Sequence, residues 1–181
     1  MSRKIFLSAG HGGTDSGAVG NGFIERDLTI DLRNHIAREL KALGIVPSID
    51  SDRNALSQTL AWLRGKFKSK DILLDLHWNA SSNPEAKGSE VIIPDIASQF
   101  EKDLAKALLK VFTELGFKDR GVKPEALTAR KKLGWMRPVA ENVLIEVCFI
   151  SNITDMKLYE ANKNNIAKKI ASTLNHYSKL P

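Results

Sequence analysis

Several features are scarce or missing in this chain of 181 residues, and each absence excludes a class of protein. Because Cys148 is the single cysteine, no internal disulfide framework can form. No apolar run approaches the roughly 18 residues of a membrane-spanning helix, so we expect no membrane span. The first residues lack the apolar stretch of a secretion signal, so we expect synthesis in the cytoplasm without a signal peptide. Repeats, low-complexity tracts and linkers are also missing, which predicts one domain over residues 1–181.

The charge balance is basic, since 27 Lys and Arg residues against 21 Asp and Glu residues give a net charge of +6. A basic surface favours an anionic partner such as nucleic acid, a membrane surface or an anionic wall polymer. A solvated basic surface without any partner explains the same charge. The sequence has neither zinc-finger spacing nor a basic repeat interleaved with aromatic residues, so we expect no nucleic-acid partner.

Short apolar runs alternate with amphipathic stretches along most of the chain. The apolar runs predict strands at residues 4–7, 45–49, 72–77, 90–93 and 143–147. Apolar residues spaced by three and four predict helices at residues 27–43, 54–67 and 97–115, and two helical stretches within 154–177. The basic residues 118–137 show no clear period and are expected to be rich in loops. This alternation predicts an α/β fold, with a single domain around a twisted, mostly parallel sheet and helices on both faces.

Four residues that can bind a metal or transfer protons lie near predicted strand or helix ends. His11 follows the first strand, His77 ends the strand at 72–77, Glu146 lies near the end of the strand at 143–147, and Glu25 precedes the first long helix. Open parallel sheets place their sites beyond the carboxyl ends of the strands. Two imidazoles and a carboxylate are the ligands of many catalytic zinc sites, and a further carboxylate can move protons. The four residues therefore form a candidate zinc hydrolase site.

Each of these residues also has a simpler interpretation. His11 could be an ordinary loop residue and His77 a hydrogen-bonded core histidine. Glu25 could be an acid favoured by the helix dipole at a helix start. Glu146 is the hardest to explain in this way, because an acid among apolar neighbours is costly to bury without a partner. The spacing of the four residues matches no short metal-binding signature such as H-E-x-x-H.

Four segments, taken in order, resemble a known family, the zinc-dependent N-acetylmuramoyl-L-alanine amidases of bacterial wall hydrolases and phage lysins. The segments are residues 8–18 (SAGHGGTDSGA), 22–28 (GFIERDL), 76–80 (LHWNA) and 144–152 (LIEVCFISN), and residues 120–123 (RGVK) look like a family segment that lines the groove. The resemblance implies His11, Glu25 and His77 as zinc ligands and Glu146 as the catalytic acid and base. It also implies hydrolysis of the amide between N-acetylmuramic acid and L-alanine.

The same resemblance implies peptidoglycan as the substrate and zinc as the cofactor. We expect a monomer that acts on the cell wall after release by lysis or a holin-type route. Two other functions remain open, namely a zinc carboxypeptidase or peptidase acting on stem peptides, and a wall-binding module without catalysis. Residues 128–138 match the family only loosely, which leaves the contacts to the stem peptide open.

Further residues have more than one possible role. Strand alternation places Asp75 on the same face as His77, where it could orient the imidazole or be a salt-bridged acid. Trp78 stands where the family often has a smaller residue. Cys148 is expected to be a core residue rather than a nucleophile, and alternation places it beside Glu146 as a minor wall of the site. The basic residues 118–137 could attract anionic peptidoglycan or teichoic acid, or could be solvated.

Overall fold

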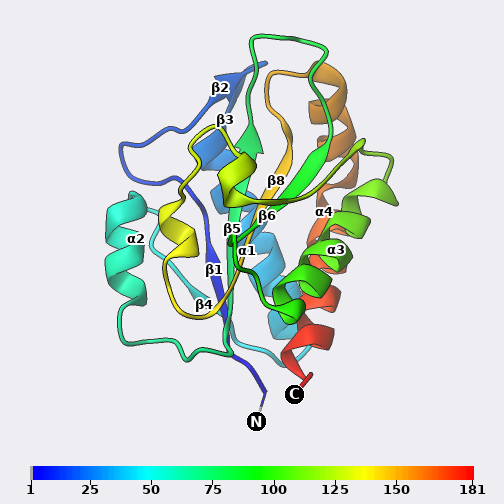
Figure 1. Ribbon diagram of the computed structural model, residues 1–181. Coiled ribbons are helices and arrows are strands. Elements are labelled where there is room, and N and C mark those ends of the chain that lie inside the picture. The colour runs from blue at the N-terminus through cyan, green and yellow to red at the C-terminus, as the bar shows by residue number, and fades with distance from the viewer. Residues whose placement is uncertain (1) are drawn as a thin grey trace.

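The computed structural model describes residues 2–181, in which a mixed sheet is covered by helices (Figure 1). The helices are α1 (Glu25–Ala42), α2 (Leu56–Leu63), α3 (Gln99–Thr113) and α4 (Ile153–Ser178), with short 3-10 turns η1 (Glu125–Leu127) and η2 (Gly134–Met136). The strands are β1 (Ile5–Ser8), β2 (Val19–Gly20), β3 (Phe23–Ile24), β4 (Ser48–Ile49), β5 (Ile72–Asn79), β6 (Ser89–Ile93), β7 (Asp119–Pro124) and β8 (Glu141–Phe149).

The main sheet has six strands in the order β4-β1-β5-β8-β6-β7. The pairs β1·β4, β1·β5, β5·β8 and β6·β7 are parallel, and only β6·β8 is antiparallel. β2 and β3 form a separate antiparallel ribbon. The predicted fold class is therefore confirmed. β1 and β5 run in the same direction, so the residues after both strands lie at one edge of the sheet.

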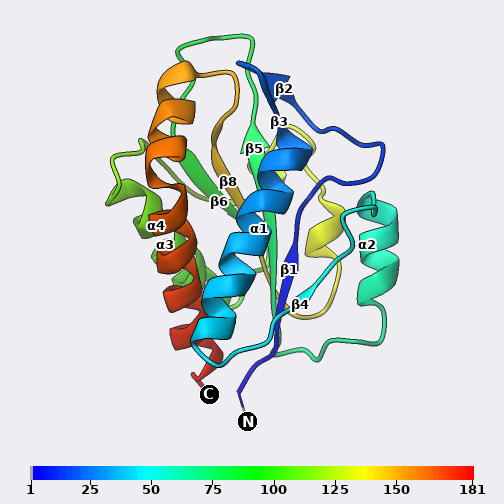
Figure 2. The same ribbon diagram turned by 180° about the vertical axis from the view of Figure 1, so that it is seen from behind.

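The two faces of the sheet are covered unequally. α1, α3 and α4 pack on one face (Figure 2), where Leu74 of β5 and Ile145 of β8 join the larger apolar core. α2 and η2 cover part of the other face, where Leu73 packs with Leu63 and Trp135 in a smaller cluster. No helix within residues 2–181 is long and apolar enough to span a bilayer.

Three elements differ from the sequence prediction. β7 lies in the segment expected to be rich in loops, and its polar residues gave no apolar run because it is an edge strand paired only with β6. α4 is one helix of 26 residues rather than two stretches. Its buried residues resume at Ile166 after Tyr159, and the residues between them are exposed or half-buried; Lys163 pairs with Asp31 of α1 at 3.0 Å. The second strand is reduced to β4, since Val46 is exposed and Pro47 has no N–H to donate.

The prediction that Cys148 lines the site is wrong, although its assignment to the core holds. His77 pairs with Glu146, but the next pair is Asn79 with Phe149, so β8 contains one extra residue at this point. Such a bulge shifts the alternation of side chains by one position. Cys148 therefore faces the helices, and its sulfur lies 4.0 Å from the sulfur of Met156.

Candidate metal centre and cleft

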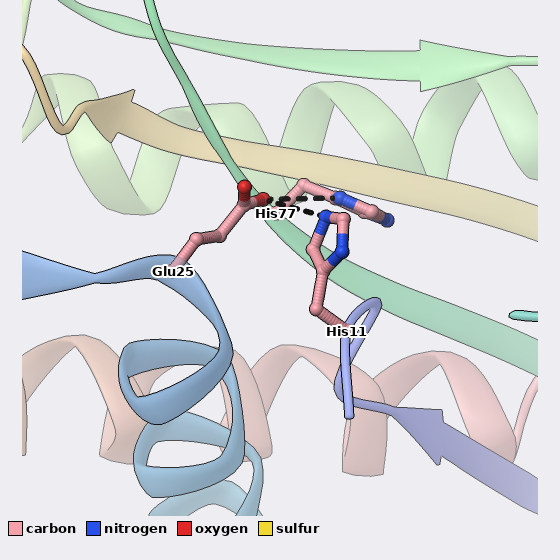
Figure 3. Close-up of side chains that lie close together, drawn as sticks. All are labelled: His11, Glu25 and His77. Atoms are coloured by element: carbon pink, nitrogen blue, oxygen red, sulfur yellow. Dashed lines mark hydrogen bonds and ion pairs between the residues drawn. The ribbon is translucent and has the colours of Figure 1, made fainter. Parts of the chain in front are cut away.

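Three side chains that can bind a metal meet at the edge of the sheet where β1 and β5 end (Figure 3). His11 lies in the loop after β1, Glu25 is the first residue of α1, and His77 lies near the end of β5. One donor atom of each lies within 4.8 Å of the other two. The structure therefore brings together the three residues that the sequence indicated as ligands.

Two glycines allow the loops to approach this site. Gly10 has φ +62°, and a Cβ there would lie 2.4 Å from the carbonyl oxygen of Leu76 and 2.7 Å from Nε2 of His77. Gly17 has φ +61°, and a Cβ there would lie 2.6 Å from Oε2 of Glu25. Only glycine adopts this backbone region at little cost, and both spaces are already filled. The glycine-rich segment before α1 is thus needed to form the site.

The carboxylate of Glu25 is buried and held by four contacts. The backbone N–H of Trp78 donates to Oε1 at 2.9 Å, and that of Ala18 donates to Oε2 at 2.8 Å. Oε1 also lies 3.3 Å from Nε2 of His11 and 3.2 Å from Nδ1 of His77. Burial raises the pKa of Glu25, but the hydrogen bonds and charges of the two histidines outweigh it and hold the pKa far below its usual range. Glu25 is therefore an anion at neutral pH.

Each imidazole has a second carboxylate at its other nitrogen. Asp15 Oδ2 lies 3.0 Å from Nδ1 of His11, and Asp75 Oδ2 lies 3.1 Å from Nε2 of His77. Burial lowers the pKa of both histidines, but the neighbouring carboxylates raise it to above its usual value. Carboxylates in this position fix the orientation of ligating imidazoles and make them more basic. Asp75 thus has the geometry of an orienting partner, one of the two roles left open for it.

The three inner donor atoms fit a divalent metal such as zinc. Zinc bonds of about 2.0–2.1 Å imply separations of roughly 3.3–3.4 Å between the donors of a tetrahedral site. The distances from Oε1 of Glu25 to the nitrogens of His11 and His77, 3.3 and 3.2 Å, are close to that value. Two imidazoles and one carboxylate also leave a fourth position open for water or substrate. His11, Glu25 and His77 are therefore suited to hold the ion.

Glu146 lies beside this group without belonging to it. It pairs with His77 across β5·β8 and with Glu90 across β6·β8, and its Oε2 atom is buried without a hydrogen-bond partner among residues 2–181. Burial raises the pKa of Glu146 to about 7; the charge of His77 opposes this shift, whereas the carboxylates of Glu25, Glu90 and Asp75 add to it. A partnerless carboxyl group that titrates near neutral pH is suited to proton transfer.

The metal-binding residues and Glu146 line a cleft of about 780 Å³. One wall is the loop after β1, with Gly10 and Asp15, and the floor includes residues of β5, β6 and β8. Another wall runs from the end of η1 to the start of η2, within the segment that was expected to be rich in loops. The residues of that wall in the cleft are Leu127, Thr128, Ala129, Arg130, Lys132, Leu133 and Gly134.

One charged group in the cleft was missed by the sequence analysis. Glu90 accepts hydrogen bonds from Asn79 at 3.1 Å, Arg120 at 3.0 Å and Lys123 at 2.5 Å. A signal for it was present, because Glu90 is an acid next to an apolar strand run, as Glu146 is. The expectation that residues 120–123 line the groove is confirmed for Arg120 and Lys123. Trp78 instead turns its ring to the helix side, against Tyr159.

The cleft of this α/β domain contains two histidines, one glutamate and a second carboxyl group. These are the features of a metal-dependent hydrolase. The model of the N-acetylmuramoyl-L-alanine amidase family matches residues 5–176 of this chain. The chain therefore belongs to the N-acetylmuramoyl-L-alanine amidase family.

Individual relatives agree with this assignment. The chain is similar to the N-acetylmuramoyl-L-alanine amidase LytC of Bacillus subtilis (strain 168), with 31% identity over 159 residues, covering 86% of this chain and 31% of LytC. It is also similar to the endolysin of Bacillus phage SPP1, with 29% identity over 154 residues, covering 81% of this chain and 56% of the endolysin. The chain thus spans about a third of one of these relatives and just over half of the other.

Solved structures show the same fold. The putative N-acetylmuramoyl-L-alanine amidase from Neisseria meningitidis superposes with a TM-score of 0.73 at 28% identity, over 96% of this chain and 94% of that chain. Cwp6 from Clostridium difficile superposes with a TM-score of 0.80 at 23% identity, over 97% of this chain and 29% of that chain. The relation to Cwp6 is evidence for the fold alone.

Proposed function

We propose that this chain is a zinc-dependent hydrolase of the amide bond between N-acetylmuramic acid and L-alanine in peptidoglycan. Residues 1–181 would act as one catalytic domain at the cell wall. The observation that carries the proposal is the convergence of His11, Glu25 and His77 beside the partnerless carboxyl group of Glu146, in one cleft of a chain from this family.

His11, Glu25 and His77 are the residues that would hold zinc. Bound zinc supplies Lewis acidity, which polarises the scissile carbonyl and makes a water molecule more acidic. Asp75, hydrogen-bonded to the far nitrogen of His77, would keep that ring in the orientation for binding, and Asp15 lies close enough to His11 to form an ion pair with it. Glu25 is fixed by the N–H groups of Trp78 and Ala18, so the site is organised before the ion enters.

Glu146 has the role of general base and then general acid in this proposal. Its carboxylate accepts a proton from the water that attacks the lactyl carbonyl carbon, and a bond forms between the water oxygen and that carbon. When the carbon–nitrogen bond breaks, Glu146 delivers the proton to the departing amine nitrogen of L-alanine. Protons balance over the cycle, because Glu146 is an ionised carboxylate both at the start and at the end.

The direct test is product analysis on purified peptidoglycan, with and without a chelator and with zinc added back. We expect release of peptides that begin with a new L-alanine amino terminus, loss of release with the chelator, and recovery with zinc. Release of single residues or fragments that leave the muramic acid amide intact would instead identify a peptidase. Binding to the wall with zinc but without any release would identify a non-catalytic binding module.

A further inference from the structure

The wall of the cleft opposite the metal-binding residues is a basic turn formed by residues 128–133, between η1 and η2. Arg130, Lys131 and Lys132 follow one another in this turn. Arg130 and Lys132 line the cleft, whereas Lys131, which has φ +58°, does not. Figure 1 shows the turn, in yellow, crossing the face of the sheet that α1, α3 and α4 leave free.

The basic turn is tied down at both ends. The buried carboxylate of Glu125 accepts a hydrogen bond from the backbone N–H of Leu133 at 2.6 Å and pairs with Arg137. The N–H of Thr128 donates to the carbonyl oxygen of Glu125 at 2.9 Å. The buried indole of Trp135 donates to the carbonyl oxygen of Leu73 in the sheet at 3.3 Å. Arg130 and Lys132 therefore stand on an anchored segment rather than on a free loop.

The cations near this wall outnumber the carboxylates that pair with them. Arg120 and Lys123 also line the cleft, and both bind the single carboxylate of Glu90. Across residues 2–181, Arg130 and Lys132 have no salt bridge to a carboxylate, so only Arg120 and Lys123 of these four cations are paired, both with Glu90. The guanidinium of Arg120 also lies over the ring of Phe149, 4.8 Å from its centre, which holds it in place.

The same cleft also contains groups of the opposite charge. Glu25, Asp75 and Glu146 line it with carboxyl groups, together with the two histidines. A ligand in the cleft therefore meets the metal-binding residues and also Arg130 and Lys132, two cations without a salt bridge. A neutral amide followed by a carboxylate on the same molecule fits this distribution of charge.

We propose that Arg130 and Lys132, together with Arg120 and Lys123, form a subsite for a free carboxylate of the stem peptide that follows L-alanine. The inference rests on the proposed amidase function and adds a specificity to it. Arg130 and Lys132 select stem peptides whose carboxylates are free over those whose carboxylates are amidated, because an amide offers no negative charge to a pair of cations.

The test uses two soluble compounds of the same length, an N-acetylmuramoyl-L-alanyl peptide with its remaining carboxylates free and the same compound with them converted to carboxamides. We expect the zinc-loaded protein to cleave the free acid with a kcat/KM roughly tenfold higher, mostly through KM, as charge-assisted hydrogen bonds of ordinary strength would give. In the R130Q/K132Q variant the ratio of the two kcat/KM values should fall towards one. The preference should also shrink as salt is raised.

Lys131 provides the matched control, since it carries the same charge in the same turn and does not line the cleft. The K131Q variant should keep the activity and the tenfold preference of the parent. Equal cleavage of both compounds by the parent protein would overturn the proposal, and so would an equal loss of kcat/KM on both compounds in R130Q/K132Q.

A binding measurement separates this proposal from the amidase function itself. The free peptide, with L-alanine first and its carboxylates free or amidated, is titrated into the parent and into R130Q/K132Q. Failure to cleave either compound would refute the amidase function, while tighter binding of the acidic peptide that R130Q/K132Q loses would still support the subsite. Equal binding of the two peptides, with tight binding of poly(glycerol phosphate), would overturn it in favour of a wall phosphate.

Discussion

The two faces of the sheet differ in character although the same strands form both: one packs into the apolar core, and the other lines the polar cleft. In β5, Leu74 packs into the helix-covered core while Asp75 and His77 face the cleft, and in β8 Ile145 and Glu146 divide in the same way. Successive side chains of a strand point to opposite faces, so residues for stability and residues for chemistry alternate along one segment. One face is closed and apolar, whereas the other contains His77 and Glu146, whose pKa values are both raised, that of Glu146 by burial and that of His77 by neighbouring carboxylates against burial. An apolar core can therefore support buried polar groups that are adjacent to core residues in the same strand.

The largest effect should come from removing a ligand on the cleft face. In His77→Ala we expect the metal to bind more than 100-fold more weakly, because loss of a group that merely orients a ligand already costs about 10–100-fold. Amidase activity should be lost with it, and metal titration by calorimetry or equilibrium dialysis measures the effect. His176→Ala, at an exposed histidine near the end of α4, is the control and should bind metal normally. One equivalent of zinc bound with unchanged affinity in His77→Ala would refute the ligand assignment.

A substitution on the opposite face of β5 should lower the stability of the fold and leave metal binding unchanged. Leu74→Ala leaves a cavity in the fully buried core, so the free energy of unfolding should fall by about 2–5 kcal/mol. The folded fraction should still bind metal with the affinity of the parent. Denaturant unfolding measures the loss, and Ile96→Ala, at an exposed residue, should change it by less than about 0.5 kcal/mol. A weakened metal site in folded Leu74→Ala would show that the two faces are not independent.

The polar face should also make stability depend on pH through Glu146. Its pKa is about 7 in the folded protein against a usual 4.5, so the protonated group is favoured on folding. This contribution is fully present below about pH 4.5 and is lost as the pH rises through 7, by up to ~3 kcal/mol. In metal-free protein, Glu146→Gln should therefore gain stability relative to the parent between pH 5 and pH 8. Glu85→Gln, at an exposed loop residue, should show no such gain, and a pH-independent difference for Glu146→Gln would contradict the burial argument.

A smaller effect is expected from the carboxylate behind His77. Asp75→Asn keeps the shape of the side chain but removes the charge next to Nε2, so zinc should bind about 10–100-fold more weakly without loss of the site. Competition with a chromogenic chelator measures the difference. Asp103→Asn, on α3 and away from the cleft, is the matched control. An unchanged zinc affinity in Asp75→Asn would leave Asp75 as a structural ion-pair partner only.

Strands could be predicted from the sequence where an apolar run coincides with a buried position in the sheet. Residues 72–77 and 143–147 form apolar runs, and both are central strands. β7 could not be found in this way, because an edge strand with charged residues is defined by its pairing with β6 and not by its own pattern. Cys148 was placed on the wrong face because a bulge between paired strands leaves no mark in the sequence.

The candidate site was predictable for a different reason. His11, Glu25, His77 and Glu146 lie at strand or helix ends, and the motifs around them resemble one family. Arg120 and Lys123 in the cleft were also expected from the resemblance, but the position of Arg130 and Lys132 in its lining could not be predicted. Glu125 holds the turn that carries Arg130 and Lys132 through a local contact to Leu133, and Trp135 fixes it to the sheet through Leu73, 62 positions away in the sequence.

The most direct test of the account is to measure zinc content and turnover together in Glu146→Gln, with Glu85→Gln as the control. Glu146 lies outside the metal-binding group, and proton transfer is its proposed role. We therefore expect one bound zinc per chain and a kcat lower by about 10²–10⁴-fold on peptidoglycan. Full activity of Glu146→Gln with zinc still bound would contradict the account.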